Sequence, residues 1–89
     1  MLELIKKRCG IASSVKVYDE DIMAYMDDCE ADLKASGVPG SIANDRQNES
    51  VLTAMTLYVK AYLAEDTAET EKYLDLYRKK VFRLTLEEG

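Results

Sequence analysis

The side chains in this sequence that could do chemistry are its carboxylates, two thiols and six tyrosines, since the chain contains no histidine. Aspartate and glutamate contribute 17 of the 89 residues and gather mainly in two runs, residues 19–32 and 65–71. Carboxylates act as general acids or bases where an apolar pocket shifts their pKa values. These runs lie instead in polar, helix-forming stretches, and the four scattered glycines build no phosphate-binding loop. The sequence therefore predicts no catalytic site, and we expect that the protein is not an enzyme.

The two cysteines, Cys9 and Cys29, are expected to be buried structural thiols because both fall on apolar stripes of predicted helices. The opening residues MLELIKKRCG contain no apolar signal core, so the reducing cytoplasm is the expected compartment and a disulfide is disfavoured. Without histidine, two distant cysteines lack the ligand spacing of a zinc site. The acidic run also lacks the glycine and the ligand spacing of a calcium loop. We expect no metal and no cofactor.

The length of 89 residues predicts one domain covering residues 1–89. A domain this small often depends on disulfides, a metal or partner subunits for its stability. With the first two disfavoured, subunit association is the remaining source. The net charge of −5 argues against wrapping nucleic acid, which requires a basic surface, and no apolar run is long enough to span a membrane.

Four helices are predicted from the hydrophobic periodicity, so the expected fold is all-α, a small bundle of about four helices. The first helix begins at Leu2 and ends at Gly10, and residues 11–18 form a loop. The second helix is expected to be capped by Asp19 and to end at Gly37. Its predicted buried face consists of Ile22, Met26, Cys29 and Leu33.

The opposite face of the second helix carries Ala24, Ala31 and Ala35. Alanine is the best helix former, and this property alone accounts for the pattern. The alternative hypothesis is a flat strip against which a helix of a neighbouring subunit packs closely.

A long polar loop, residues 38–48, is predicted between the second and third helices because Pro39 and Gly40 prevent the second helix from resuming. It exceeds the usual length of a helix–helix connection. We interpret it either as slack chain or as an arm that contacts a partner.

The third helix follows a cap at Asn48 and is apolar around more than half of its circumference, apart from a polar edge of Glu49, Thr53, Thr56 and Lys60. A helix of this kind is buried on several sides, so we predict that it is the central helix. The last helix is expected to begin after a cap at Asp66. Phe82 and Leu86 lie off its inward face and are either simply exposed or in contact with another subunit.

Opposite charges are separated along the chain. The acidic residues occupy the two runs, whereas the basic residues gather near the two ends, as Lys6, Lys7, Arg8, Arg78, Lys79, Lys80 and Arg83. These are either ordinary solvated faces or patches of opposite sign that join subunits head to tail.

The tyrosine pairs at positions 58 and 62 and at positions 73 and 77 are interpreted as the rim of the core rather than as platforms for nucleic-acid bases. A DNA-reading helix-turn-helix is disfavoured, because the loop is long and the helix after it carries a single lysine, Lys60. A DNA-binding regulator is also disfavoured by the acidic charge. A small cytoplasmic helical regulator that binds a protein partner, of the antirepressor or antitoxin type, stays open as an alternative function.

In the order of its features, the chain resembles the small head–tail connector (adaptor) proteins of tailed bacteriophages. These features are a short helix in LELIKKRCGI, an acidic-capped helix in DEDIMAYMDDCEADLKASGV, a polar loop, an apolar helix in AMTLYVKAYLAED and a last helix in AETEKYLDLYRKKVFRL. The resemblance extends over nearly all of the sequence. It implies an all-α structural protein of the virion without catalytic activity.

The resemblance also implies a homo-oligomeric, dodecamer-like ring that bridges the portal protein and the tail completion or stopper proteins, with DNA passing through its channel as cargo. It implies assembly in the host cytoplasm, a final place at the head–tail interface and no membrane contact. One hypothesis is that the acidic runs line the channel, because like charge keeps DNA from sticking. The candidate contacts with other subunits, portal or tail are Lys6, Lys7, Arg8, Val38, Pro39, Ile42, Arg46, Arg78, Phe82 and Leu86.

Overall fold

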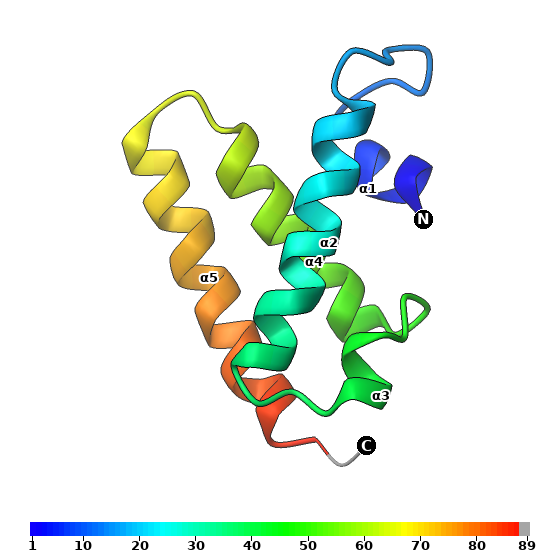
Figure 1. Cartoon of the computed structure of the whole chain (residues 1–89). Helices are drawn as coiled ribbons and strands as arrows, with labels where there is room; N and C mark the ends of the chain where they lie inside the picture. Colours follow the sequence, from blue (N-terminus) through cyan, green and yellow to red (C-terminus); the bar gives the residue numbers. More distant parts are fainter. Residues whose placement is uncertain (88–89) are drawn as a thin grey trace.

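The computed structural model describes residues 1–87, which form five helices and no strand (Figure 1). In chain order these helices are α1 (Leu2–Arg8), α2 (Asp19–Ala35), α3 (Gly40–Ala43), α4 (Glu49–Leu63) and α5 (Thr67–Thr85). The expected all-α bundle is confirmed. None of the helices described here is long and apolar enough to cross a bilayer.

Helix α4 is the central element, as its apolar circumference predicted. It packs against α5, α2 and α1. Its buried residues occupy most of its length and are Val51, Leu52, Ala54, Met55, Thr56, Val59 and Ala61. Thr56 was expected on a polar edge but is buried, and it is accommodated there because its hydroxyl donates a hydrogen bond to the Leu52 carbonyl at 2.8 Å.

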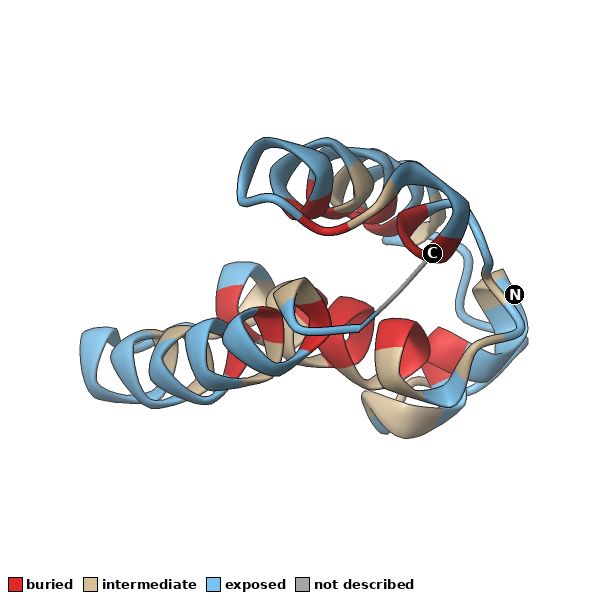
Figure 2. Cartoon of the chain, turned by 90° about the horizontal axis from the view of Figure 1, so that it is seen from below, coloured by how far each residue is buried: buried red, intermediate tan, exposed pale blue. Residues whose placement is uncertain are grey.

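Helices α1, α2 and α5 pack against α4, and the buried positions face the interior between two layers of helices (Figure 2). On α2 the buried face consists of Ile22, Met26, Cys29 and Leu33, as predicted. On α5 the buried residues are Tyr77, Val81 and Leu84. The domain is only 17 Å deep along its shortest axis, so two layers account for its whole thickness.

Two of the three predicted N-terminal helix caps are confirmed, those at Asn48 and Asp66. Asn48 Oδ1 accepts hydrogen bonds from the backbone N–H groups of Ser50 and Val51, and Asp66 Oδ1 accepts one from Glu69 N–H at 2.7 Å. The prediction for Asp19 is wrong, because α2 begins at Asp19 itself and its carboxylate makes no cap hydrogen bond. That carboxylate instead faces a lysine of α1, described below.

The segment after α2 is more ordered than a free loop. Gly37 adopts φ +99°, and the Val38 N–H donates to the Leu33 carbonyl at 3.0 Å, which completes a Schellman end to the helix. The chain then forms the short helix α3, which places Ile42 and Ala43 in the core. The expected long loop is therefore largely a packed connection.

Candidate interaction surfaces

Lys6, one of the predicted contact residues, does not lie on the surface of the domain. Its side chain is fully buried, although a lysine at the N-terminus was expected to be exposed. The Lys6 ammonium donates hydrogen bonds to the carbonyls of Val15 at 2.6 Å and Ser13 at 3.2 Å, and lies 2.8 Å from Asp19 Oδ1. The contact with Asp19 is an ion pair without hydrogen-bond alignment, since Oδ1 has no aligned donor. Lys6 thus fixes the loop 11–18 against the start of α2.

The neighbouring basic residues behave differently from Lys6. Lys7 is exposed, as a contact residue requires. Arg8 pairs with Glu49 at 3.1 Å and so ties α1 to the beginning of α4. Arg46 bridges two carboxylates of α2, Asp27 at 3.0 Å and Glu30 at 3.3 Å. Arg8 and Arg46 are therefore already engaged within the chain, and only part of each remains accessible.

The apolar candidates in the segment after α2 are not available either. Val38 is 3% exposed and Ile42 is 8% exposed, so both belong to the core. Both are members of the hydrophobic core cluster that also contains residues of α2 and α4, so they do not project from the surface. Pro39 is half-buried between them. In contrast, Phe82 and Leu86 near the end of α5 are 66% and 70% exposed.

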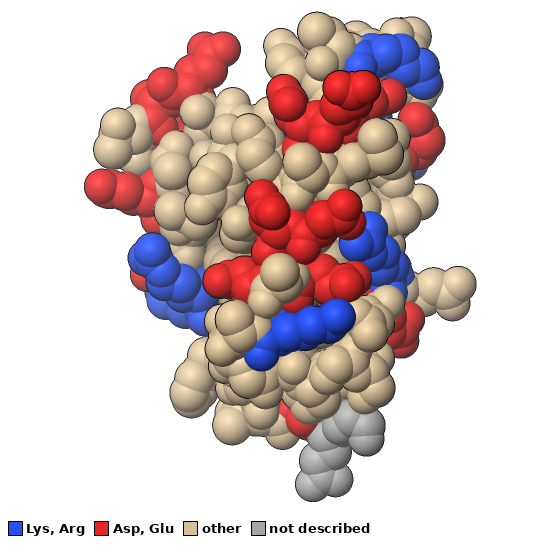
Figure 3. Space-filling view, in the orientation of Figure 1, with Lys and Arg blue, Asp and Glu red and all other residues tan. Residues whose placement is uncertain are grey.

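The outward side of α2 is strongly acidic. Helix α2 carries seven acidic residues and one lysine, and in Figure 3 carboxylates gather over this helix at the front of the molecule. We use the name α2 acidic face for its exposed outward residues Glu20, Asp21, Ala24, Asp27, Asp28 and Ala31. The two alanines leave a shallow strip between the carboxylates.

The outward side of α5 is basic and partly apolar over its second half. From Tyr77 to Thr85 this helix carries four basic residues and no acidic one. Leu57 of α4 and Leu76, Lys79, Lys80 and Arg83 of α5 line an open groove of about 250 Å³. We use the name α5 basic face for Leu76, Lys79, Lys80, Phe82 and Arg83.

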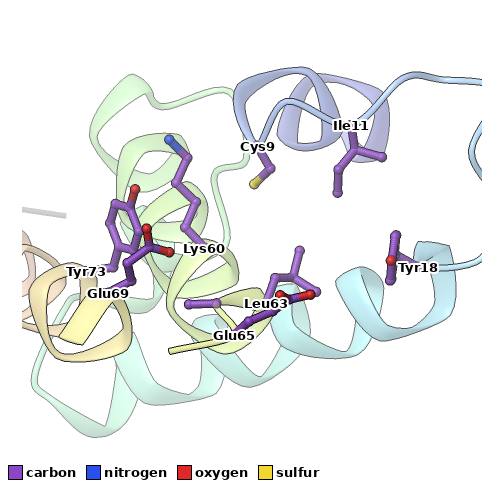
Figure 4. A pocket seen from close by; sticks show the side chains of 9 residues that line it. Cys9, Ile11, Tyr18, Lys60, Leu63, Glu65, Glu69 and Tyr73 are labelled. Carbon is purple, nitrogen blue, oxygen red and sulfur yellow. The ribbon is translucent and has the colours of Figure 1, made fainter. Parts of the chain in front are cut away.

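A larger open groove of about 400 Å³ lies where α1, the loop after it and the α4–α5 turn meet (Figure 4). Cys9 and Ile11 approach it from one side and Lys60, Glu69 and Tyr73 from another. Burial raises the pKa of the Cys9 thiol, so this thiol is not activated as a nucleophile. Within residues 1–87 no three Cys, Asp or Glu side chains are arranged to hold a metal ion.

The tyrosines join the helices at the rim of the core. The Tyr77 hydroxyl donates a hydrogen bond to Asp32 Oδ2 at 2.6 Å, which connects α5 to α2. The ring of Tyr58 stands edge-on to that of Tyr77, with centroids 5.1 Å apart. Burial, together with the hydrogen bond to Asp32, raises the pKa of Tyr77. Sequence periodicity placed Tyr77 inward but gave no signal for its partner, because Asp32 lies 45 residues away.

A family model described as phage connector protein matches residues 1–89. No significant match is found among curated proteins or among solved structures.

Proposed function

Because this chain belongs to the phage connector protein family, we propose that it is a head–tail connector that assembles into a homo-oligomeric ring between the portal and the tail. Connector proteins of this family are structural rather than catalytic, and membership implies a component of the virion. The family match over the whole chain is the observation that carries the proposal.

The surface of the domain fits this role better than that of an enzyme. The thiol of Cys9 in the larger groove is not activated, whereas large apolar side chains such as Phe82 and Leu86 are left in water. Exposed apolar residues next to charged ones are typical of surfaces that contact other proteins. On this proposal the partners are further copies of the chain, the portal protein and the tail completion or stopper proteins.

The acidic balance of the chain suits passage of DNA through the ring during packaging and ejection. With a net charge of −5, the protein cannot gain much from counterion release on binding DNA. A channel of like charge repels the phosphates weakly and so lets the duplex slide. The ring would be assembled in the host cytoplasm and end at the head–tail interface of the virion.

The test is negative-stain electron microscopy of the concentrated protein, alone and mixed with the portal protein of the same phage. We expect annular particles, or an added layer of density on the portal when the free chain is monomeric. An unrelated acidic helical protein of similar size is the control. If the portal gains no density and the chain forms no annulus at any concentration, the connector role is refuted.

A further inference from the structure

We propose that neighbouring subunits of the ring meet head to tail, with the α5 basic face of one copy docked on the α2 acidic face of the next. The inference rests on the proposed ring and goes beyond it, because it names the two surfaces that touch. The occupant of each face is thus a second copy of this chain.

Each face pairs one of its charges within the subunit, Asp27 with Arg46 and Lys79 with Asp75, and leaves others without a partner among the described residues. In the part of the chain that the structure describes, no ion pair involves Glu20, Asp21 or Asp28 of α2. Within residues 1–87, no ion pair involves Lys80 or Arg83 of α5 either. Each face therefore carries charged side chains without an ion-pair partner in the described part of its own subunit, and those of the other face have the opposite sign.

The apolar residues of the two faces also differ in size, large on α5 and small on α2. Phe82 projects from α5 between basic residues and is 66% exposed, although it is the only phenylalanine of the chain. Ala24 and Ala31, seven residues apart, form the shallow strip on α2 between its carboxylates. A projecting aromatic ring over a strip of methyl groups buries apolar area, while flanking lysine and arginine reach carboxylates on both sides.

The proposed contact is of the head-to-tail kind that a ring requires. The two faces are different surfaces of one subunit, so their contact is heterologous and each copy keeps one free face for the next. Such a contact forms a closed ring if the rotation between copies closes.

Charge reversal tests the pairing directly. One variant carries Lys80→Glu with Arg83→Glu, which makes both of its faces acidic. The other carries Asp21→Lys with Asp28→Lys, which reverses two of the four carboxylates of its α2 face and brings the net charge of that face to zero. Lys7→Glu with Lys72→Glu, and Glu65→Lys with Glu71→Lys, change the net charge equally at exposed positions outside the two faces and serve as matched controls.

Association is measured by sedimentation velocity at about 50 mM and about 500 mM salt, after circular dichroism has shown that each variant is folded. Each face-reversed variant alone should associate on the order of tenfold more weakly than the natural chain. Their equimolar mixture should associate at least as tightly as the natural chain, through alternating subunits, and this gain should disappear at high salt. The control variants should match the natural chain.

The proposal is overturned if the face-reversed variants associate like their controls, or if mixing them produces no association beyond that of each alone. The second criterion applies even when the natural chain is monomeric in isolation. If the variants still form annuli on the portal, the connector function stands and the pairing of faces fails. If the mixture associates while the natural chain adds nothing to the portal, the pairing stands and the connector function fails.

Discussion

Replacing the buried Lys6 by methionine tests the most unexpected interaction in the domain. Methionine keeps much of the apolar stem but removes the ammonium group. The carbonyls of Ser13 and Val15 then lose their donor, and the carboxylate of Asp19 loses its counter-ion. The loop 11–18 loses its main polar attachment to α1.

The expected loss of stability follows from this geometry. Removing one partner of a buried ion pair costs about 3–5 kcal/mol. The Asp19 side chain is 19% exposed and regains some hydration, so we take the lower limit, about 3 kcal/mol. For a domain of this size each kcal/mol corresponds to about 5 °C, which predicts a fall in melting temperature of about 15 °C.

Thermal and urea denaturation followed by circular dichroism measure this loss. Lys7→Met is the matched control, because Lys7 is the adjacent residue on the same helix but is exposed. It should change the free energy of unfolding by less than about 0.5 kcal/mol. A double-mutant cycle with Asp19→Asn isolates the ion pair and should give a coupling of about 1–3 kcal/mol. The reasoning is refuted if Lys6→Met is as stable as Lys7→Met.

Three further results are expected. Asn48→Ala removes the cap of α4 and should lower the free energy of unfolding by about 1 kcal/mol in urea titrations, and an unchanged midpoint would contradict the cap assignment. Phe82→Ala should leave the helix content and, in dilute monomeric protein, the melting temperature unchanged while it weakens self-association in sedimentation, so an unaltered oligomer mass would argue against a contact role for this ring. Burial raises the pKa of the Cys29 thiol from 9.0 to about 12, so the unfolded chain releases this proton at lower pH than the folded chain and stability should fall as pH rises above 9. The contribution of Cys29 to this slope is at most about 1.4 kcal/mol per pH unit, and Cys29→Ala should lower the slope by that amount between about pH 9 and pH 11. Cys9, Tyr58 and Tyr77, whose pKa values burial also raises, keep their own contributions, and a slope in the variant equal to that of the natural chain would exclude the Cys29 thiol as a cause.

The buried faces of the helices could be predicted because helical periodicity is a local property of the sequence. The buried stripe of α2 and the central position of α4 both follow from the spacing of apolar residues. The caps Asn48 and Asp66 were also predictable, since a capping side chain bonds to backbone groups two or three residues away. Phe82 was identified as an off-face residue by the same spacing.

The polar interactions that connect different helices could not be predicted in this way. Lys6 belongs to a basic group for which the sequence predicts a surface contact, whereas its burial depends on two carbonyls of the loop 11–18 and a carboxylate at the start of α2. The hydrogen bond from Tyr77 to Asp32 likewise depends on how two helices cross. The burial of Val38 and Ile42 depends on the short helix α3. The sequence does not indicate this helix, because most residues of the segment 38–48 are polar or turn-forming.

The distribution of charge connects the stability of one subunit to its assembly. Helix α2 concentrates seven acidic residues, and within the described residues only Asp19, Asp27 and Glu30 have a cation at ion-pair distance. The remaining like charges repel one another along the helix and lower the stability of the isolated domain. A basic face of a second copy relieves this repulsion, so binding to the folded state stabilises it by mass action. The same carboxylates that weaken the free subunit therefore favour its association with a neighbour.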